Sequence, residues 1–460
     1  MNNIIVVGGG AGGLMAAIAA AREGASVTIF EKNEKLGKKI YITGKGRCNI
    51  TNDCDPDDFF AHVIRNPKFM YSSYYGFMAQ SMMDLLKGAG LAIKTERGNR
   101  VFPVSDHASD VTKTLEKLAR AHGVKIELNT PVVSLLIENP PHPEDGFYWE
   151  ENASGETKVT GVRVLRGGRR EDIKADSVIL ATGGLSYPTT GSSGDGYKWA
   201  QDAGHKIMPL SPSLVPMLAD HSQRLMLADM AGLSLKNVRA TLYDGTKKIA
   251  SEFGEMLYTH TGVSGPIIIS MSAALSGKYF AKAQAQEAAP KTQTAKKQVD
   301  KALSQPAALT LEIDYKPALS ESELDARLVR EFDAAKNKSL KNVMHTLLPE
   351  SAILPLLNQV EISPDSQIHD ITKTQRTAII KALKGFKLTI TGLGGFDEAI
   401  ITRGGICVKE IDPSTMHSKL AKNLYFAGEI IDIDAYTGGF NLQLAWSTGY
   451  AAGVSAAQRD

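Results

Sequence analysis

The glycines between positions 8 and 13 are the first residues whose spacing suggests chemistry, because they match the pattern G-x-G-x-x-G. Gly8 permits a tight turn, Gly10 lets a pyrophosphate approach the backbone, and Gly13 lets a helix pack closely on a strand. A helix that begins at such a turn directs free N–H groups and a partial positive charge at the phosphates. The pattern predicts a dinucleotide site contacted by Gly8, Gly10, Ala11, Gly12 and Gly13.

An acidic residue, Glu31, follows at the end of the next predicted strand. A carboxylate at this place can accept hydrogen bonds from an adenosine ribose, and it would repel a 2′-phosphate. The expected nucleotide is therefore FAD or NAD rather than NADP. The alternative, a glycine-rich turn with a surface glutamate, is disfavoured because strand, glycines, helix and acid occur in register.

A second strand-to-helix junction near the C-terminus favours FAD over NAD. Residues 424–427 form an apolar run that ends in Gly428 and Glu429, and Gly438 and Gly439 then open an Ala/Gly-rich helix. Backbone N–H groups at such a junction can bind the pyrimidine edge of a flavin, and Glu429 can bind ribityl hydroxyls. A simple NAD dehydrogenase has no use for this junction.

Two residues in a glycine-flanked loop are further candidates. Arg47 could bind the flavin or a substrate carboxylate, and the alternative is an arginine that positions phosphate or lies at the surface. Cys48 could react with the flavin, but disulfide reductases rely on two closely spaced cysteines and Cys54 is more distant. A small buried side chain is the favoured role of Cys48.

His260 lies in a turn rich in Gly, Thr and Pro, where a rigid scaffold tends to place catalytic groups. It is a candidate proton donor or substrate ligand, although a lone histidine is more often structural. Tyr436 and Asp434 beside the second glycine pair are weaker catalytic candidates, with ribityl contact or packing as the alternatives. Motifs of zinc and serine hydrolases do not occur, and no metal site is predicted.

These segments together resemble the BaiN-like flavoproteins, also called BaiN/RdsA or YhiN-type oxidoreductases, within the wider class of glutathione reductase and fumarate reductase relatives. Besides the two junctions, the resemblance is carried by residues 43–52 (TGKGRCNITN), 181–184 (ATGG), 190–196 (TGSSGDG) and 259–266 (THTGVSGP). It implies FAD bound to a split domain that a β-barrel and a helical subdomain interrupt. Lys38 stands where arginine is expected, which keeps the charge but loses the bidentate fork.

The resemblance also implies which residues contact the cofactor, in addition to the first glycine motif and Glu31. These are Lys32, Lys38, Lys39, Thr43, Gly44, Gly46, Arg47, Cys48, Asn49, Val133, Ala181, Thr182, Gly183, Gly428, Glu429, Gly438, Gly439, Phe440, Asn441 and Leu442.

The elements that must position these residues indicate an α/β fold. Apolar residues 4–7, the helical run 14–21 and the alternating Val27 and Ile29 predict a β-α-β unit. Further strands are expected around residues 124–128, 132–136, 147–149 and 159–165. The fully apolar run 178–181 predicts a central strand of a parallel sheet.

The predicted domain order is a split Rossmann-like FAD-binding domain with two inserted parts. Residues 1–205 form its first part and 397–460 its second. An inserted β-barrel subdomain occupies 206–318, with a mobile loop at 281–307 where large apolar side chains are almost lacking. Capping-box spacing at Ser320 and Thr372 predicts a small helical bundle over 319–385, and 386–396 is the return strand of the insert.

Composition restricts the possible partners. The 460 residues are 43% hydrophobic and 22% charged, with a net charge of +2 and basic residues spread along the chain, so a nucleic-acid partner is not favoured. The three cysteines form no close pair, which fits the reducing cytoplasm. Glycines interrupt the uncharged stretch 4–21, so membrane insertion is not expected. A homo-oligomer remains possible.

The function predicted from these features is that of an FAD-dependent oxidoreductase acting on a small molecule. The resemblance favours reduction of a conjugated double bond. NAD(P)H is expected as a transient reductant, since the insert contains no second dinucleotide fingerprint. A flavin amine oxidase that uses oxygen and a non-catalytic FAD-binding or redox-sensing protein are the alternatives.

Overall fold

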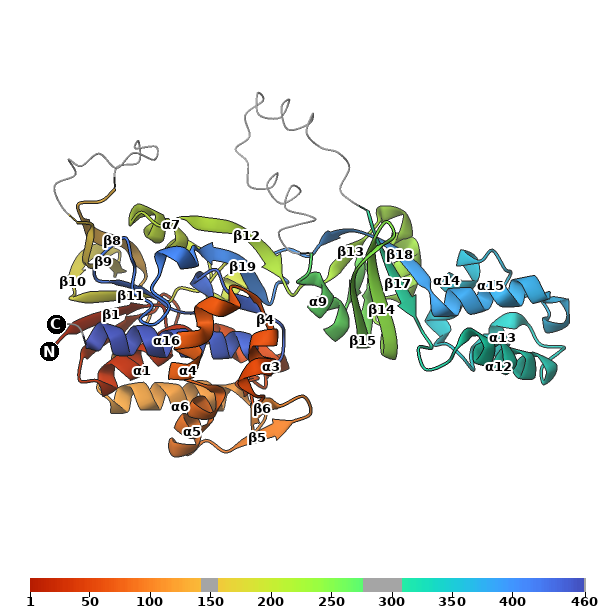
Figure 1. Cartoon of the computed structure of the whole chain (residues 1–460), viewed down its shortest axis with the longest axis horizontal. Coiled ribbons are helices and arrows are strands. Elements are labelled where there is room, and N and C mark those ends of the chain that lie inside the picture. Colours follow the sequence, from red (N-terminus) through yellow and green to blue (C-terminus); the bar gives the residue numbers. More distant parts are fainter. Residues whose placement is uncertain (142–155, 276–307, 459–460) are drawn as a thin grey trace, which may run out of the picture. The chain divides into compact units, whose positions relative to one another are not determined.

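The computed structural model describes residues 1–141, 156–275 and 308–458 and divides the chain into two compact units. Unit 1 consists of Met1–Pro212 together with Ala399–Asp460, and unit 2 consists of Ser213–Glu398. The chain therefore leaves unit 1 and returns to it after unit 2 is complete (Figure 1).

A parallel five-stranded sheet in the order β20-β11-β1-β2-β7 forms the centre of unit 1. Its strands are β1 (Asn3–Val7), β2 (Ser26–Phe30), β7 (Lys125–Glu127), β11 (Ser177–Leu180) and β20 (Leu424–Phe426). β1 and β11 lie inside the sheet and are buried on both faces, which explains their continuous apolar sequences. Because the strands are parallel, the residues that follow them meet at one edge.

Helices α1 (Ala11–Arg22) and α16 (Phe440–Ala457) lie side by side against this sheet (Figure 1). Glycines allow their backbones to come close. A Cβ on Gly449 would lie 2.4 Å from the Gly12 carbonyl oxygen, and a Cβ on Gly453 would lie 2.2 Å from that of Ala16. The first and last helices of unit 1 are thus packed backbone to backbone.

The remaining elements of unit 1 surround this centre. The antiparallel sheet β10-β9-β8 contacts β11 through β9. The other strands of the unit pair as β3-β6-β5, β21-β4 and β12-β19. Their bounds are β3 (Thr51–Asn52), β4 (Val63–Arg65), β5 (Ile93–Glu96), β6 (Arg100–Pro103), β8 (Val132–Glu138), β9 (Lys158–Arg166), β10 (Arg169–Lys174), β12 (Ile207–Ser213), β19 (Ile401–Ile406) and β21 (Asp434–Ala435). The helices are α2 (Lys38–Ile42), α3 (Pro56–Ala61), α4 (Tyr71–Gly76), α5 (Ala79–Gly88), α6 (Ala108–Ala121) and α7 (Asp195–Asp202).

Unit 2 is built on a closed barrel in the order β13-β16-β15-β14-β17-β18. The strands are β13 (Met217–Ala219), β14 (Ser234–Asp244), β15 (Lys247–Thr259), β16 (Gly262–Ser264), β17 (Leu309–Asp314) and β18 (Phe386–Leu393), accompanied by α8 (Arg224–Met230) and α9 (Pro266–Ser272). Val238, Ala240 and Leu242 are buried, as the alternating pattern of β14 predicts.

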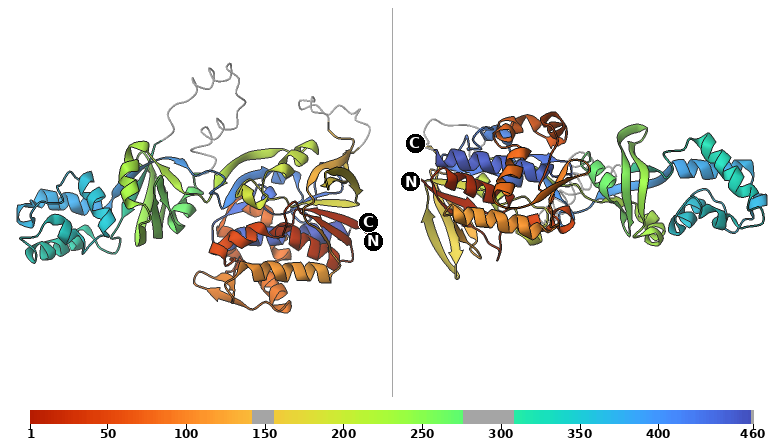
Figure 2. Two further views of the ribbon diagram at one scale, coloured as in Figure 1. Left: turned by 180° about the vertical axis from the view of Figure 1, so that it is seen from behind. Right: turned by 90° about the horizontal axis from the view of Figure 1, so that it is seen from below.

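Helices α12 (Glu321–Asp333), α13 (Leu340–Met344), α14 (Glu350–Gln359) and α15 (Lys373–Lys384) gather at one end of this barrel (Figure 2). Both predicted capping boxes are present, at Ser320 with Glu323 and at Thr372 with Gln375. Buried leucines and isoleucines of these helices share one apolar core with the barrel.

The predicted fold class, a Rossmann-type α/β domain interrupted by a β-barrel and a small helical bundle, is confirmed. The expected strand at 147–149 and the expected mobile loop at 281–307 lie outside the described residues. Within the described part of the chain, no helix has the length and apolar character that a membrane span requires.

Candidate functional site

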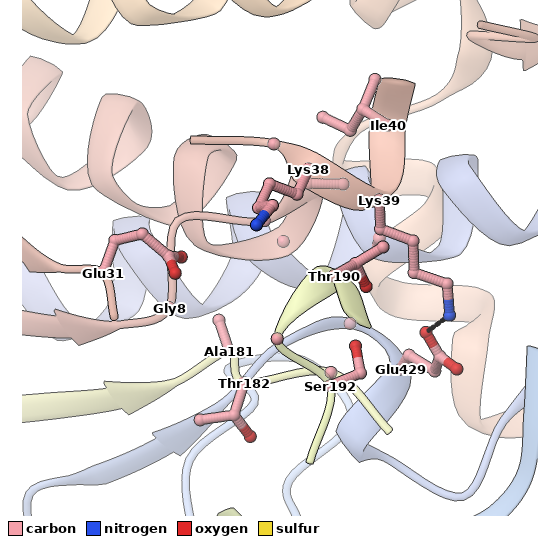
Figure 3. Close-up of a pocket in the computed structure, with 18 of the residues that line it drawn as sticks. Gly8, Glu31, Lys38, Lys39, Ile40, Ala181, Thr182, Thr190, Ser192 and Glu429 are labelled. Carbon is pink, nitrogen blue, oxygen red and sulfur yellow. Dashed lines mark hydrogen bonds and ion pairs between the residues drawn. The ribbon is translucent and has the colours of Figure 1, made fainter. Parts of the chain in front are cut away.

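A pocket lies in unit 1 where the carboxyl ends of the parallel strands meet (Figure 3). Its walls come from segments at both ends of the chain, as the split domain requires. The cofactor residues predicted from the sequence that line it are Gly8, Gly10, Ala11, Gly12, Glu31, Lys32, Lys38, Lys39, Thr43, Ala181, Thr182, Gly183, Gly428, Glu429, Asn441 and Leu442.

The turn between β1 and α1 leaves an open helix N-terminus in the pocket. Gly8 has φ 103° and a Cβ there would lie 2.5 Å from the Ala181 carbonyl oxygen, so the turn requires glycine. A Cβ on Gly10 would meet nothing within 4 Å, and none of the described side chains caps α1. The first N–H groups of α1 and the space beside Gly10 fit a pyrophosphate.

Glu31 is buried, with 8% of its surface exposed, and its carboxylate is held from both sides. The Gly9 N–H donates to Oε2 at 2.8 Å. Asn33 donates to Oε1 through its backbone N–H at 2.8 Å and its Nδ2 at 2.7 Å. Since an ionised carboxylate offers about four acceptor sites, Glu31 can still accept a hydrogen bond from a ribose hydroxyl.

Lys39 and Glu429 form an ion pair at the other side of the pocket from Glu31 (Figure 3). Lys39 Nζ lies 2.5 Å from Glu429 Oε2 and 2.5 Å from Ser186 Oγ, and Ser186 Oγ donates to Glu429 Oε1 at 2.5 Å. The backbone N–H of Thr402 donates to the same Oε1 at 2.9 Å. The network balances the Glu429 charge, and its Lys39 ammonium group belongs to a residue of the pocket lining.

A polar bridge joins the segment after β2 to the start of α7 at the pocket wall. Lys32 Nζ lies 2.9 Å from Asp195 Oδ2 and also contacts Ser193 Oγ, which donates to Asp195 Oδ2 at 2.6 Å. Burial opposes ionisation of Asp195, but the hydrogen bonds from Ser193 and Lys32 outweigh it and lower the pKa of this carboxyl. Lys38 Nζ is bonded to Asn33 and Glu34.

The structure does not place Arg47 in the pocket wall. Its Nε lies 2.8 Å from Asp106 Oδ1, its Nη2 lies 2.5 Å from Glu96 Oε1, and its guanidinium lies 4.1 Å from the centre of the Phe102 ring. These hydrogen bonds raise the pKa of Arg47 and lower those of Glu96 and Asp106. The guanidinium is engaged by carboxylates of its own unit.

Cys48 is fully buried and has the left-handed φ of 61°. Burial raises the pKa of its thiol to about 12, so the thiol is neutral at pH 7. This environment agrees with the favoured structural role. Gly44, Gly46 and Asn49 belong to the same loop and do not line the pocket either.

Several other residues that were predicted to contact the cofactor do not line the pocket. A Cβ on Gly13 would lie 1.9 Å from the Gly8 carbonyl oxygen, and a Cβ on Gly439 would lie 2.4 Å from that of Thr51, so both glycines serve packing. Gly438 and Phe440 also lie outside the lining, and the Phe440 ring stacks on His62. Val132 lines the pocket in place of Val133, because alternate residues of β8 face opposite sides.

The four catalytic candidates occupy different places, and none lines the pocket. His260 is exposed in the turn between β15 and β16 of unit 2, whereas the pocket residues belong to unit 1. The backbone N–H of Tyr436 donates to the His62 carbonyl, and its half-buried ring lies edge-on to His62. Arg47 is held by Glu96 and Asp106. Asp434 is fully buried, with Oδ1 4.0 Å from Arg403 Nε.

Part of the pocket wall consists of residues that the sequence motifs do not predict. Asn33 follows the carboxyl end of the parallel strand β2, a position that could have identified it, whereas Val132 begins the antiparallel strand β8. Ser193 and Asp195 belong to the segment 190–196 that carries the family resemblance, and Trp199 lies beyond it in α7. Ile400 and Ile401 reach the pocket through tertiary structure, without a local signal. In the described residues, no group of three or more His, Cys, Asp or Glu side chains could hold a metal ion.

Comparison with known proteins places this architecture in a family. Residues 2–455 match the family model described as HI0933-like protein Rossmann domain. The chain belongs to this family. The family predicted from the sequence motifs, the BaiN/YhiN type, is thereby confirmed.

Curated relatives cover nearly the whole chain. A 3-dehydro-bile acid delta(4,6)-reductase from Clostridium scindens is 31% identical over 461 residues, which span 100% of both proteins. A ribosomal RNA dihydrouridine synthase from Haemophilus influenzae is 27% identical, covering 96% of this chain and 95% of that protein. The protein of the same name from Escherichia coli is also 27% identical, covering 95% and 94%.

Proposed function

We propose that the chain is an FAD-dependent oxidoreductase that reduces a C=C bond conjugated to a carbonyl group, with electrons from NAD(P)H. The observation that carries the proposal is the meeting, in one pocket, of an open helix N-terminus, the buried acid Glu31 and the C-terminal wall around Gly428 and Glu429.

The residues of the pocket fit FAD in three places. Gly8, Gly10 and the first N–H groups of α1 would hold the pyrophosphate. Glu31 would accept from the adenosine ribose. Glu429 and the N-terminal residues Asn441 and Leu442 of α16 would hold the flavin half, with Lys39 and Ser186 keeping Glu429 in place.

The names of the relatives support reduction of a conjugated bond. One is a delta(4,6)-reductase of a bile acid, and the others form dihydrouridine. A steroid enone and the uracil ring both contain a C=C bond next to a carbonyl, so both accept hydride at the carbon β to that carbonyl. When bound, the reduced flavin supplies the hydride. The chain must orient the substrate and provide or admit one proton.

A small organic substrate is preferred over RNA for this chain. Its net charge of +2 is close to balance, and RNA binding relies on concentrated positive charge. Identity is also higher to the bile acid reductase than to the two synthases, at 31% against 27%. His260, predicted from the sequence as a proton donor or substrate ligand, and the weaker catalytic candidate Tyr436 remain the candidates for the second half of the reaction.

The test is a pair of anaerobic half-reactions on purified protein. We expect heat to release intact FAD, and NADH or NADPH to bleach the yellow colour. A 3-keto-4-ene steroid should then restore the colour faster than air or a uridine-containing oligoribonucleotide does. Release of FMN, or lack of flavin after reconstitution, would contradict the proposal. Fast reoxidation by air alone indicates an oxidase, and failure of every electron donor indicates a sensor.

A further inference from the structure

The side-chain amide of Asn33 connects three parts of the pocket wall. Its Nδ2 donates to Glu31 Oε1 at 2.7 Å and to the Thr190 carbonyl oxygen at 3.1 Å. Its Oδ1 accepts from Lys38 Nζ at 3.3 Å. All four residues line the pocket. Since a primary amide has two N–H donors, both are used here.

The backbone presents this amide from a fixed position. The Asn33 carbonyl accepts from the Asn129 N–H at 3.0 Å, and the Glu31 carbonyl accepts from the Thr130 N–H at 2.9 Å. These bonds involve main-chain atoms alone, so a change of the Asn33 side chain leaves them in place. Loss of the amide therefore affects the three groups that the Asn33 side chain contacts, which are Glu31 Oε1, the Thr190 carbonyl oxygen and Lys38 Nζ.

The opposite segment is shaped to receive the amide. Gly191, next to Thr190, has φ 104°, and a Cβ on it would lie 2.5 Å from Asn33 Nδ2. Only glycine leaves room for the amide against this backbone. The contact is thus a close fit between two segments that are distant in sequence.

We infer that Asn33 is a positioning residue for nucleotide recognition and acts through Glu31, an inference that rests on the proposed function. The buried carboxylate is held by three N–H donors, and Asn33 supplies two of them. Removing Nδ2 leaves Oε1 with the Asn33 backbone N–H as its one donor from this residue, so the carboxylate is held less firmly toward the ribose. The neighbouring Lys38 ammonium and the Thr190 carbonyl lose the same partner.

Two substitutions separate positioning from simple support of a turn. Asn33→Ala removes the amide, and Asn33→Asp replaces two donors with a carboxylate beside Glu31 Oε1. We expect FAD binding by the apoprotein to weaken about tenfold in Asn33→Ala, equivalent to about 1.4 kcal/mol, and more in Asn33→Asp. Asn3→Ala is the matched control, because Asn3 Nδ2 bonds the Lys174 carbonyl at 3.0 Å outside the pocket.

The decisive readout compares FAD with an analogue that contains 2′-deoxyadenosine, by titration of apoprotein whose fold is checked by circular dichroism. If Asn33 acts through Glu31, wild type prefers FAD, and Asn33→Ala loses most of this preference. In a Glu31→Gln background, Asn33→Ala should weaken FAD binding by less than about twofold, because the free-energy effects of substitutions at interacting residues are not additive.

Equal loss of affinity for both ligands, additive effects with Glu31→Gln, or unchanged binding in Asn33→Ala would each overturn the inference while the proposed function stands. Wild-type apoprotein that binds no FAD overturns both. A change in Asn3→Ala as large as that in Asn33→Ala would also count against Asn33, because it would show a general response of unit 1.

Discussion

Replacing Glu31 with glutamine tests whether its charge serves both the fold and the nucleotide. Glutamine keeps the size of the side chain but turns one acceptor oxygen into an N–H₂ group. If the remaining oxygen faces Asn33, which supplies two donors, the N–H₂ group faces the Gly9 N–H, which then has no acceptor. A buried unsatisfied donor costs about 1–3 kcal/mol, so the apoprotein should lose that much free energy of unfolding.

The effect on the ligand is separate from the effect on the fold. A hydrogen bond to a charged acceptor contributes about 1.5–3 kcal/mol, so losing the charge should weaken FAD binding about ten- to hundredfold. Glu31→Arg should be more severe and strip most of the FAD, because it also places a cation at the ribose.

Thermal unfolding of the apoprotein and fluorescence titration with FAD measure the two effects. For domains of about 150–250 residues, each kcal/mol lowers Tm by about 2–4 °C. Glu127→Gln is the matched control, because Glu127 ends the neighbouring strand β7 and does not line the pocket. A lower Tm with unchanged FAD affinity would refute the ribose contact, and unchanged values of both would refute the buried hydrogen-bond network.

Three further substitutions test the packing, the pH response and the proton donor. Gly449→Ala should lower the free energy of unfolding by about 1–3 kcal/mol in urea titrations, because its Cβ would lie 2.4 Å from the Gly12 carbonyl oxygen, whereas Gly88→Ala in an open helix position should not. Burial lowers the pKa of His205 from 6.5 to about 4. As the pH falls, the unfolded chain therefore binds a proton at His205 before the folded chain does, and the stability present above pH 6.5 is lost as the pH approaches 4. Between pH 7 and 4.5 the loss should be about 2–3 kcal/mol, and His205→Gln should flatten it; an equal slope in the variant would exclude His205. If His260 donates the proton, His260→Asn should keep FAD but slow reoxidation by substrate about 10²- to 10⁴-fold, and an unchanged rate would remove it from the mechanism.

The part of the site that the sequence predicts is the part governed by local backbone geometry. The turn at Gly8, the open helix start at Gly10 and the acid after the second strand are set by residues within one β-α-β unit. Glycine at position 8 is required by its left-handed φ and by the close approach of the Ala181 carbonyl, a requirement that the residue type itself indicates. The capping boxes at Ser320 and Thr372 were predictable because each depends on two residues only three positions apart.

The part that could not be predicted depends on partners far apart in the chain. Arg47 faces Glu96 and Asp106, and no local pattern indicates that these acids engage its guanidinium. The pairing of Lys39 with Glu429 joins opposite ends of the sequence. The choice of Val132 rather than Val133 depends on strand register, and a shift of one residue moves every side chain to the other face.

Assembly of the split domain and formation of the pocket are one event in this architecture. Gly12 lines the pocket and also receives the backbone of Gly449 in α16. Strand β20, which leads into Gly428 and Glu429, pairs with β11, which leads into Ala181. The wall that would hold the flavin half therefore exists only when the last segment of the chain has paired with the first. A ligand that bridges both segments stabilises this pairing by its binding free energy, so FAD occupancy and the stability of unit 1 must rise together.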